Sequence, residues 1–409
     1  MAVPTSVARV LVVSLLAVLL VPRAHAEQTV RLDNPIAGFS MQAPRDWEMA
    51  TGDLGNVFIG LDAPTGNGAP VGQPVLWFFY AKKSPQQMAQ ALVQCLQQLD
   101  GGTPQVRATG NGDEREITLT SSGTRGSLVQ KWLCRSEHGV SYVVAALVRP
   151  KMAGAFAEEM STALSSCRLI HRVAVRDYLE PNENAYRIAL PSGWQWEGNV
   201  VRTAAVPGYF QWKAQNAEHT MGAFSAPPGV FNIATPYMNA SQAAQAFVAP
   251  SLAKQIQGCR LDSIEELPRV GDYFQKLIRF IGLGSNPRMD KVRADFVGSV
   301  NGVAVRCRAD VVTLMTDGSA LLGGRGNWQM LVSGYWAPGD RWAQLGPVGR
   351  AVIASMRTDP QFKNNQFQAA GDAAAINGWW RQWRSFVFVV DYLKMGDTFN
   401  PPPLPPPDA

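Results

Sequence analysis

The side chains that could perform acid–base or nucleophilic chemistry are scattered through this sequence rather than grouped in a motif. His138, His171 and His219 stand alone, where the pattern predicts a hairpin tip, a linker and a loop. The chain contains no Gly-x-Ser-x-Gly nucleophile elbow, no His-Glu-x-x-His motif and no Walker loop. No predicted helix follows the glycine-rich loop Gly323–Gly326, so this loop indicates a hairpin turn rather than a phosphate site. We therefore predict no catalytic or cofactor-binding residue.

The five cysteines are the other reactive side chains, and their number is odd. Cys134 and Cys307 each begin a Cys-Arg-x-acid string in a strand-like run, which makes them look like equivalent positions. Cys95 lies on the apolar face of a predicted helix, and Cys259 follows the matching helix. We predict the disulfides Cys95–Cys134 and Cys259–Cys307, with Cys167 left over. The alternative is that these thiols pack as small apolar groups. No Cys-x-x-Cys spacing indicates zinc, so we predict no metal site.

One short sequence pattern, which predicts a strand and a turn, occurs twice in the chain. In each copy an aromatic and an aliphatic residue alternate at period two, a proline ends the strand, and a tryptophan follows three residues later. Separately, Gln87–Val93 aligns without gaps to Gln242–Val248, which also indicates a duplication. The structural anchors of the two copies are Phe39, Pro44, Trp47, Tyr186, Pro191 and Trp194.

The N-terminus predicts export. The apolar run Val10–Val21 precedes the small residues of Ala24-His25-Ala26, as in a secretory signal peptide cleaved near Ala26. The run is shorter than the roughly 20 apolar residues that span a bilayer. We expect an extracytoplasmic protein, periplasmic or secreted, with periplasm favoured because no further export signal is evident.

Charge argues against nucleic acid as a partner. Removal of Met1–Ala26 takes away Arg9 and Arg23 and leaves 35 basic against 32 acidic side chains. Acidic residues are interspersed where basic residues gather, so no basic stripe forms. The sequence does not indicate an oligomeric state.

The elements divide the chain into two similar halves. The first reads as strand, helix from Ser84 to Leu99, three antiparallel strands and a closing helix over 152–167, and the second repeats this order. Pro250 predicts a break or kink in the second copy of the first helix. In the second half we expect strands at 273–281, 291–300, 303–314 and 328–336, and a closing helix at 346–356. The predicted segments are a signal peptide (1–26), two α+β repeats (27–172 and 173–360), an aromatic-rich segment (361–396) and a Pro-rich tail (397–409).

The doubled motif with this element order resembles the PsbP-like α/β/α sandwich. The resemblance covers Glu27–Ile170 and Arg176–Asp359, and it rests on the aromatic-x-aliphatic-x-x-Pro-x-x-Trp openings. It implies two tandem α/β/α sandwich repeats, each an antiparallel sheet with packed helices, that work by docking onto other proteins. It transfers no catalytic residue.

The C-terminal segment is different in kind. As a helix it would place Trp379, Trp380, Trp383 and Phe386 on one apolar stripe, although part of it also reads as a strand. This stripe could pack back on the repeats, dock into a protein partner or make weak contact with a membrane interface. The tail Pro401–Pro407 predicts an extended, disordered end.

Three classes of function stay open. The favoured hypothesis is an exported, non-catalytic binding or scaffold protein that docks onto an unidentified protein partner. The alternatives are an extracytoplasmic enzyme, such as a hydrolase, with its site in the cleft between the repeats, and a peripheral membrane-associated protein that uses the Trp-rich segment.

Overall fold

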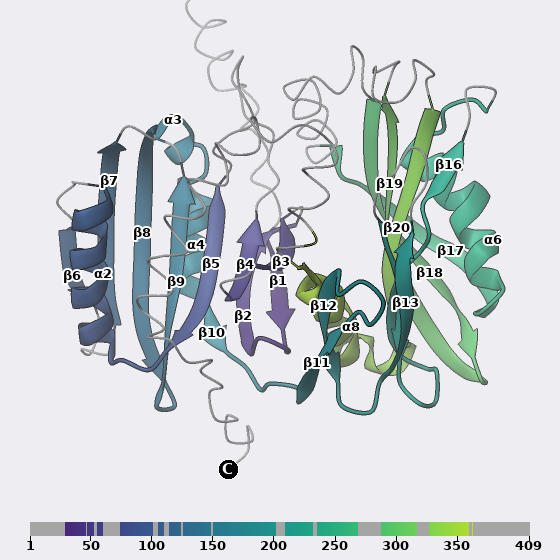
Figure 1. Ribbon diagram of the computed structural model, residues 1–409, viewed down its shortest axis with the longest axis horizontal. Helices are drawn as coiled ribbons and strands as arrows, with labels where there is room; N and C mark the ends of the chain where they lie inside the picture. The colour runs from purple at the N-terminus through teal and green to yellow at the C-terminus, as the bar shows by residue number, and fades with distance from the viewer. Residues whose placement is uncertain are drawn as a thin grey trace, which may run out of the picture.

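A computed structural model describes residues 29–45, 47–52, 55–59, 74–100, 105–109, 114–123, 126–148, 150–201, 209–231, 235–268, 288–316, 327–359 and 362. Within these residues the fold is α+β, with two large and two small antiparallel sheets. Figure 1 shows the small sheets and α8 in the middle, with a large sheet on either side and α2 and α6 on the outer flanks.

The first half is built on a seven-stranded sheet of order β3-β4-β5-β9-β8-β7-β6. Its strands are β3 (Glu48–Gly52), β4 (Gly55–Ile59), β5 (Val75–Ala81), β6 (Gln105–Thr109), β7 (Glu114–Gly123), β8 (Gly126–Glu137) and β9 (Val140–Val148). Helix α2 (Pro85–Asp100) covers one face. The other face carries α3 (Pro150–Ala153), α4 (Ala157–Ser166) and a small sheet of β1 (Thr29–Asn34), β2 (Phe39–Pro44) and β10 (Arg168–Leu169).

The second half is built on a sheet of order β13-β14-β15-β20-β19-β18-β17, with β16 also paired to β20. Its strands are β13 (Gln195–Val201), β14 (Tyr209–Gln215), β15 (Gly222–Ser225), β16 (Gly229–Phe231), β17 (Gln257–Glu266), β18 (Arg288–Val300), β19 (Val303–Thr316) and β20 (Asn327–Pro338). One face carries α5 (Ala240–Ala243), the π-helical turn η1 (Ala244–Val248) and α6 (Ala249–Ala253). The other carries η3 (Gly339–Arg341), α8 (Trp342–Ser355) and a small sheet of β11 (Val175–Leu179), β12 (Tyr186–Pro191) and β21 (Arg357–Thr358).

The two large sheets correspond strand by strand, from β3 and β13 at one edge to β6 and β17 at the other. The turn after the first motif is also the same, because the amides of Trp47 and Trp194 each donate to the carbonyl of the proline three residues earlier, at 3.1 Å. A hydroxyl at the end of each closing helix accepts a backbone amide from the small sheet. Ser166 accepts from Gln42 at 2.8 Å. Ser355 accepts from Ala189 at 2.9 Å.

Local sequence explains both first helices. In α2 the Ser84 hydroxyl accepts the Gln87 amide while the Gln87 side chain accepts the Ser84 amide, which satisfies two backbone donors that a helix start leaves unpaired. In the second half, the predicted disturbance at Pro250 is confirmed as the π-helical turn η1 directly before α6. Proline has no amide to donate, so regular α-helical bonding is lost there.

The predicted helix over 152–167 is wrong as a single element. The chain forms α3 and α4 with a turn at 154–156, because Gly154 is a poor helix former. Helix α8 begins at Trp342, four residues before its predicted start, where the indole stacks on Tyr335 at 5.5 Å between centroids. The predicted strand 273–281 and the predicted turn Gly323–Gly326 lie outside the described residues.

The predicted disulfides are not found among the described cysteines, since Cys134, Cys167, Cys259 and Cys307 are free thiols. Strands β17 and β19 pair with opposite sides of β18, so one strand separates the backbones of Cys259 and Cys307, and Cys259 lies in a register shift of β17 between Gln257 and Arg260. The side chain of Cys95 lies outside the description, and Cys134 is buried against α2. Burial raises the pKa of the Cys134 thiol to about 12.

The two halves meet at α8. This helix packs on its own sheet and also on β1 and β3 of the first half, and the core beneath it includes Ile36. Beside it, Arg45 forms an ion pair with Glu265 at 2.6 Å. The halves therefore share an interface of mixed apolar and charged character.

Candidate functional site

The predicted anchors are core residues in the structure. Phe39, Trp47 and Tyr186 are fully buried, and the Phe39 ring stacks on Phe78 at 4.3 Å between centroids. Pro44 and Pro191 end β2 and β12, and Trp194 is buried. These residues hold the small sheets to the large ones. The predicted docking residues Trp379, Trp380, Trp383 and Phe386 lie outside the described residues.

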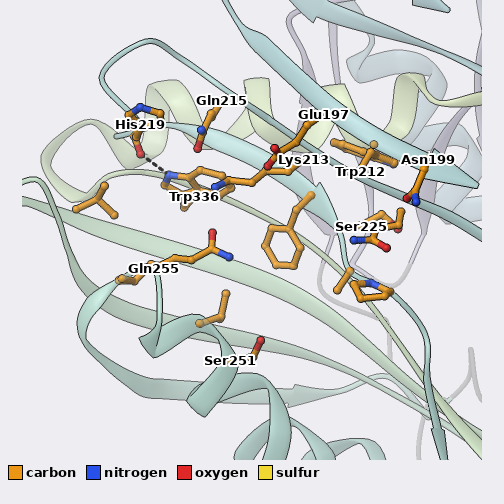
Figure 2. A pocket seen from close by; sticks show the side chains of 18 of the residues that line it. Glu197, Asn199, Trp212, Lys213, Gln215, His219, Ser225, Ser251, Gln255 and Trp336 are labelled. Atoms are coloured by element: carbon orange, nitrogen blue, oxygen red, sulfur yellow. Dashed lines mark hydrogen bonds between the residues drawn. The ribbon is translucent and has the colours of Figure 1, made fainter. Parts of the chain in front are cut away.

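A groove of about 640 Å³ lies between α6 and the β13–β15 part of the second sheet. Figure 2 shows Glu197 and Lys213 on the sheet side, with Gln255 and Ser251 across the groove. The groove exists because the helical segment α5 to α6 packs over β17, β18 and β19, and so leaves the same face of β13–β15 uncovered by a helix.

The alternation of side chains along β13 decides which of them are exposed at the groove. In β13 Trp196, Gly198 and Val200 face inward or are half-buried, while Glu197 and Asn199 are exposed. Sequence pattern alone shows this alternation, but it does not reveal that the exposed face borders a groove.

Two side chains of opposite charge and an indole line the groove. Glu197 and Lys213 are directly opposite in the β13–β14 register. The Lys213 ammonium lies 5.8 Å from the centroid of the Trp336 ring, within the range of a cation–π contact. The Trp336 indole donates to the His219 carbonyl at 3.0 Å. It lies over Gly222, where an added Cβ would meet ring atoms at 2.4 Å, so this position requires glycine.

Amide side chains make up much of the remaining lining. They are Asn199, Gln211, Gln215, Gln255 and Asn301. Amides both donate and accept hydrogen bonds, so they suit a polar ligand such as a peptide backbone. At one end the Tyr209 and Ser225 hydroxyls are 2.9 Å apart. Burial raises the pKa of Tyr209, and the bond to Ser225 opposes this only in part.

The Ser225 hydroxyl is bonded to Tyr209, and the described residues show no hydrogen bond from His219 to Ser225 or Ser251. The described residues also contain no group of three His, Cys, Asp or Glu arranged to hold a metal ion.

The groove borders an open sheet edge. Strand β13 ends the second sheet, and no other strand among the described residues pairs with its outer side. Such an edge offers unpaired backbone groups to an extended segment of another chain.

Comparisons with known proteins give weak likenesses. No family model matches the chain, and no curated protein matches it. Cyanobacterial PsbP (CyanoP) from Synechocystis sp. PCC 6803 is 10% identical with a TM-score of 0.24, covering 47% of this chain and 98% of that one. The immunity protein TplEi of T6SS from Pseudomonas aeruginosa, complexed with "L" peptide, is 12% identical with a TM-score of 0.22, covering 81% and 98%. The Tle4–Tli4 complex gives 15% identity and a TM-score of 0.23, covering 81% and 98%.

In the described residues, every helix is too short or too polar to cross a bilayer.

The PsbP-like resemblance expected from the sequence is confirmed as a weak one, and at these TM-scores it carries no inference about function.

Proposed function

We propose that this chain is an exported, non-catalytic protein-binding module, and that an extended segment of its partner lies along β13 with side chains in the groove. The observation that carries the proposal is the lining of the groove, which combines five amides, one Glu–Lys pair and a tryptophan beside an open strand edge. Amides bind peptide groups and the strand edge supplies main-chain hydrogen bonds.

We also infer that the two halves are tandem copies of one α/β/α unit, with the boundaries 27–172 and 173–360, and that residues 1–26 direct export. The matching strand orders and the matching Ser166 and Ser355 hydrogen bonds support the duplication. The aromatic-rich segment 361–396 then either covers a face of these repeats or adds to the docking surface. Because the groove is lined by amides and borders an open strand edge, peptides and proteins are the first ligands to test.

A photo-crosslinking residue at Asn199 tests the proposal in the full chain. The expected result is a specific protein captured from the native extracytoplasmic fraction and identified by mass spectrometry. Glu197→Lys should weaken capture about tenfold or more, because it removes the carboxylate opposite Lys213 and places two ammonium groups side by side. A chain that ends at Asp359 should still capture the same protein.

Glu266→Lys is the matched control. Glu266 is an exposed glutamate on β17, the opposite edge strand of the same sheet, so its reversal changes net charge equally. If both reversals weaken capture alike, charge alone is responsible and the groove is not the binding surface. Loss of capture only on truncation at Asp359 would assign docking to Trp379, Trp380, Trp383 and Phe386 instead.

A further inference from the structure

A second cavity, of about 140 Å³, lies at the junction of the halves and is named here the seam cavity. Strands β18, β19 and β20 form one wall, α8 forms another, and Met49 of β3 contributes from the first half. Its polar lining consists of Lys291, Arg293, Arg308, Asp310, Ser333, Tyr335 and Arg350. None of these residues takes part in the groove of the proposed function.

The carboxylates around the cavity are already engaged. Asp310 accepts Lys291 at 3.2 Å and Arg293 at 3.3 Å. Asp295 holds Arg308 in a two-pronged pair at 2.6 and 2.8 Å. Glu265 lies 3.8 Å from Arg293 and is shared with Arg45 of the first half.

Positive charge is nevertheless in excess. Four cations line the cavity, and the carboxylates that contact them number three. Arg350 is the cation left over, since the described residues place no carboxylate within 4.0 Å of its guanidinium. The side chains of Lys291 and Arg293 are only 7% and 11% exposed, so water screens this excess poorly.

The pKa shifts of two of these cations agree with an excess of positive charge in the cavity. Burial lowers the pKa of Lys291, and the attraction of Asp310 does not restore it because Arg293 and Arg350 oppose the proton. Burial likewise lowers the pKa of Arg350; Tyr335 and Asp310 oppose this only in part, and Arg293 and Arg308 add to the lowering. A bound anion would relieve both groups.

Among its described residues, the first half matches only one of these cations with a cation of its own. The pairs Arg135–Glu114 and Arg308–Asp295 occupy the same place, each directly opposite in the strand register and each with a tyrosine opposite the arginine. Lys291 and Arg293 lie on the part of β18 that precedes Asp295, and β7 begins only at Glu114, the residue matched to Asp295. Counting back from the matched serines that end the closing helices, Arg350 corresponds to Ser161.

We propose that the seam cavity is a binding site for a small tetrahedral oxyanion, of which inorganic phosphate is the probe. The Arg350 guanidinium is the principal ligand, supported by Arg308 and Lys291, with the hydroxyls of Ser333 and Tyr335 as neutral donors. The planar guanidinium fork suits two oxygens of such an anion. A volume of 140 Å³ has room for about five waters at about 30 Å³ each, which admits the anion but not a peptide.

Calorimetric titration of the full chain with sodium phosphate tests the site, against sodium chloride of equal ionic strength. The expected result is saturable binding of one phosphate and a raised melting temperature. Arg350→Gln should weaken binding roughly ten- to hundredfold, as expected for lost charge-assisted hydrogen bonds. A parallel titration with glycerol 3-phosphate distinguishes free phosphate from a phosphate ester as the ligand. Stronger binding of either one supports the site, and failure of both to bind overturns the proposal.

Two further variants keep the test decisive. Arg306→Gln is the matched control for the loss of one arginine. Arg306 lies on β19, two residues from Arg308, but pairs with Asp262 outside the cavity, and phosphate binding should be unchanged. Ser333→Asp supplies an internal carboxylate, so it should abolish phosphate binding and raise the melting temperature in phosphate-free buffer. Equal binding by Ser333→Asp and the unmodified chain would overturn the proposal even if Arg350→Gln fails to fold.

Discussion

Replacing Asp310 by asparagine should be among the most damaging single changes in the second half. Its carboxylate accepts Lys291 at 3.2 Å and Arg293 at 3.3 Å. At an effective dielectric constant of 20, each contact is worth about 5 kcal/mol before desolvation is subtracted. Loss of one partner from a buried pair costs about 3–5 kcal/mol in practice. Since 28% of the Asp310 side chain is exposed, we expect the lower end, about 3 kcal/mol.

The assay is thermal and urea unfolding in phosphate-free buffer. For a unit of 150–250 residues, about 3 kcal/mol lowers the melting temperature by about 6–12 °C. Asp262→Asn is the control, because its pair with Arg306 spans 3.5 Å with both side chains more than 40% exposed. That change should cost less than about 0.5 kcal/mol.

The cost in Asp310→Asn comes from a buried ammonium left without its carboxylate, so it should depend on Lys291. The double variant Asp310→Asn with Lys291→Met should lose less stability than the sum of the two single variants. Additivity within about 0.5 kcal/mol would refute this reasoning, because it would show that the two side chains do not interact. A cost below about 0.5 kcal/mol for Asp310→Asn would refute it as well.

The Asp310 carboxylate also makes the stability of the folded chain depend on pH. Burial alone would raise the pKa of Asp310, but Lys291 and Arg293 outweigh burial and hold it at about 2. Because the folded value lies below the unfolded value of about 3.9, the stabilisation is present above about pH 4 and is lost as pH falls toward 2. Asp310→Asn should lack this part of the acid transition.

Three further predictions concern packing. Ser355→Ala removes the acceptor for the Ala189 amide and should cost about 1–2 kcal/mol in urea unfolding, whereas a loss near zero would mean that water replaces the hydroxyl. Cys134 and Cys307 should resist thiol-specific labelling until the chain unfolds, and labelling in the native state or a disulfide in the peptide map would contradict the structure. Gly222→Ala should cost about 1–3 kcal/mol and shift tryptophan fluorescence, because the added methyl meets the indole above it; an unchanged spectrum and stability would disprove that contact.

Local signals in the sequence were enough to predict many elements. The serine–proline start of α2 and the dense apolar runs of β5 and β9 are visible without tertiary information, and the structure has them at nearly the expected residues. The disturbance at Pro250 follows from the missing amide of proline. These features depend on residues close together in the chain.

The candidate sites depend on residues far apart in the chain and were not predicted. Lys291, Asp310 and Arg350 come from two strands and a helix, and only the sheet order brings them together. The cysteine prediction failed for the same reason. The Cys-Arg-x-acid strings mark equivalent strands, as Cys134 on β8 and Cys307 on β19 show, but equivalence within each half does not bring a second cysteine within bonding distance.

The places where the halves differ are the places where binding is proposed. One residue after the matched tyrosines Tyr142 and Tyr335, the first sheet pairs Val143 with Phe79, whereas the second pairs Trp336 with Gly222. The second arrangement brings an indole beside Lys213 at the groove. At the seam, Arg308 has a counterpart in Arg135, whereas Arg350 corresponds to Ser161. Both halves share one strand order, so the fold accommodates either set of residues at these positions.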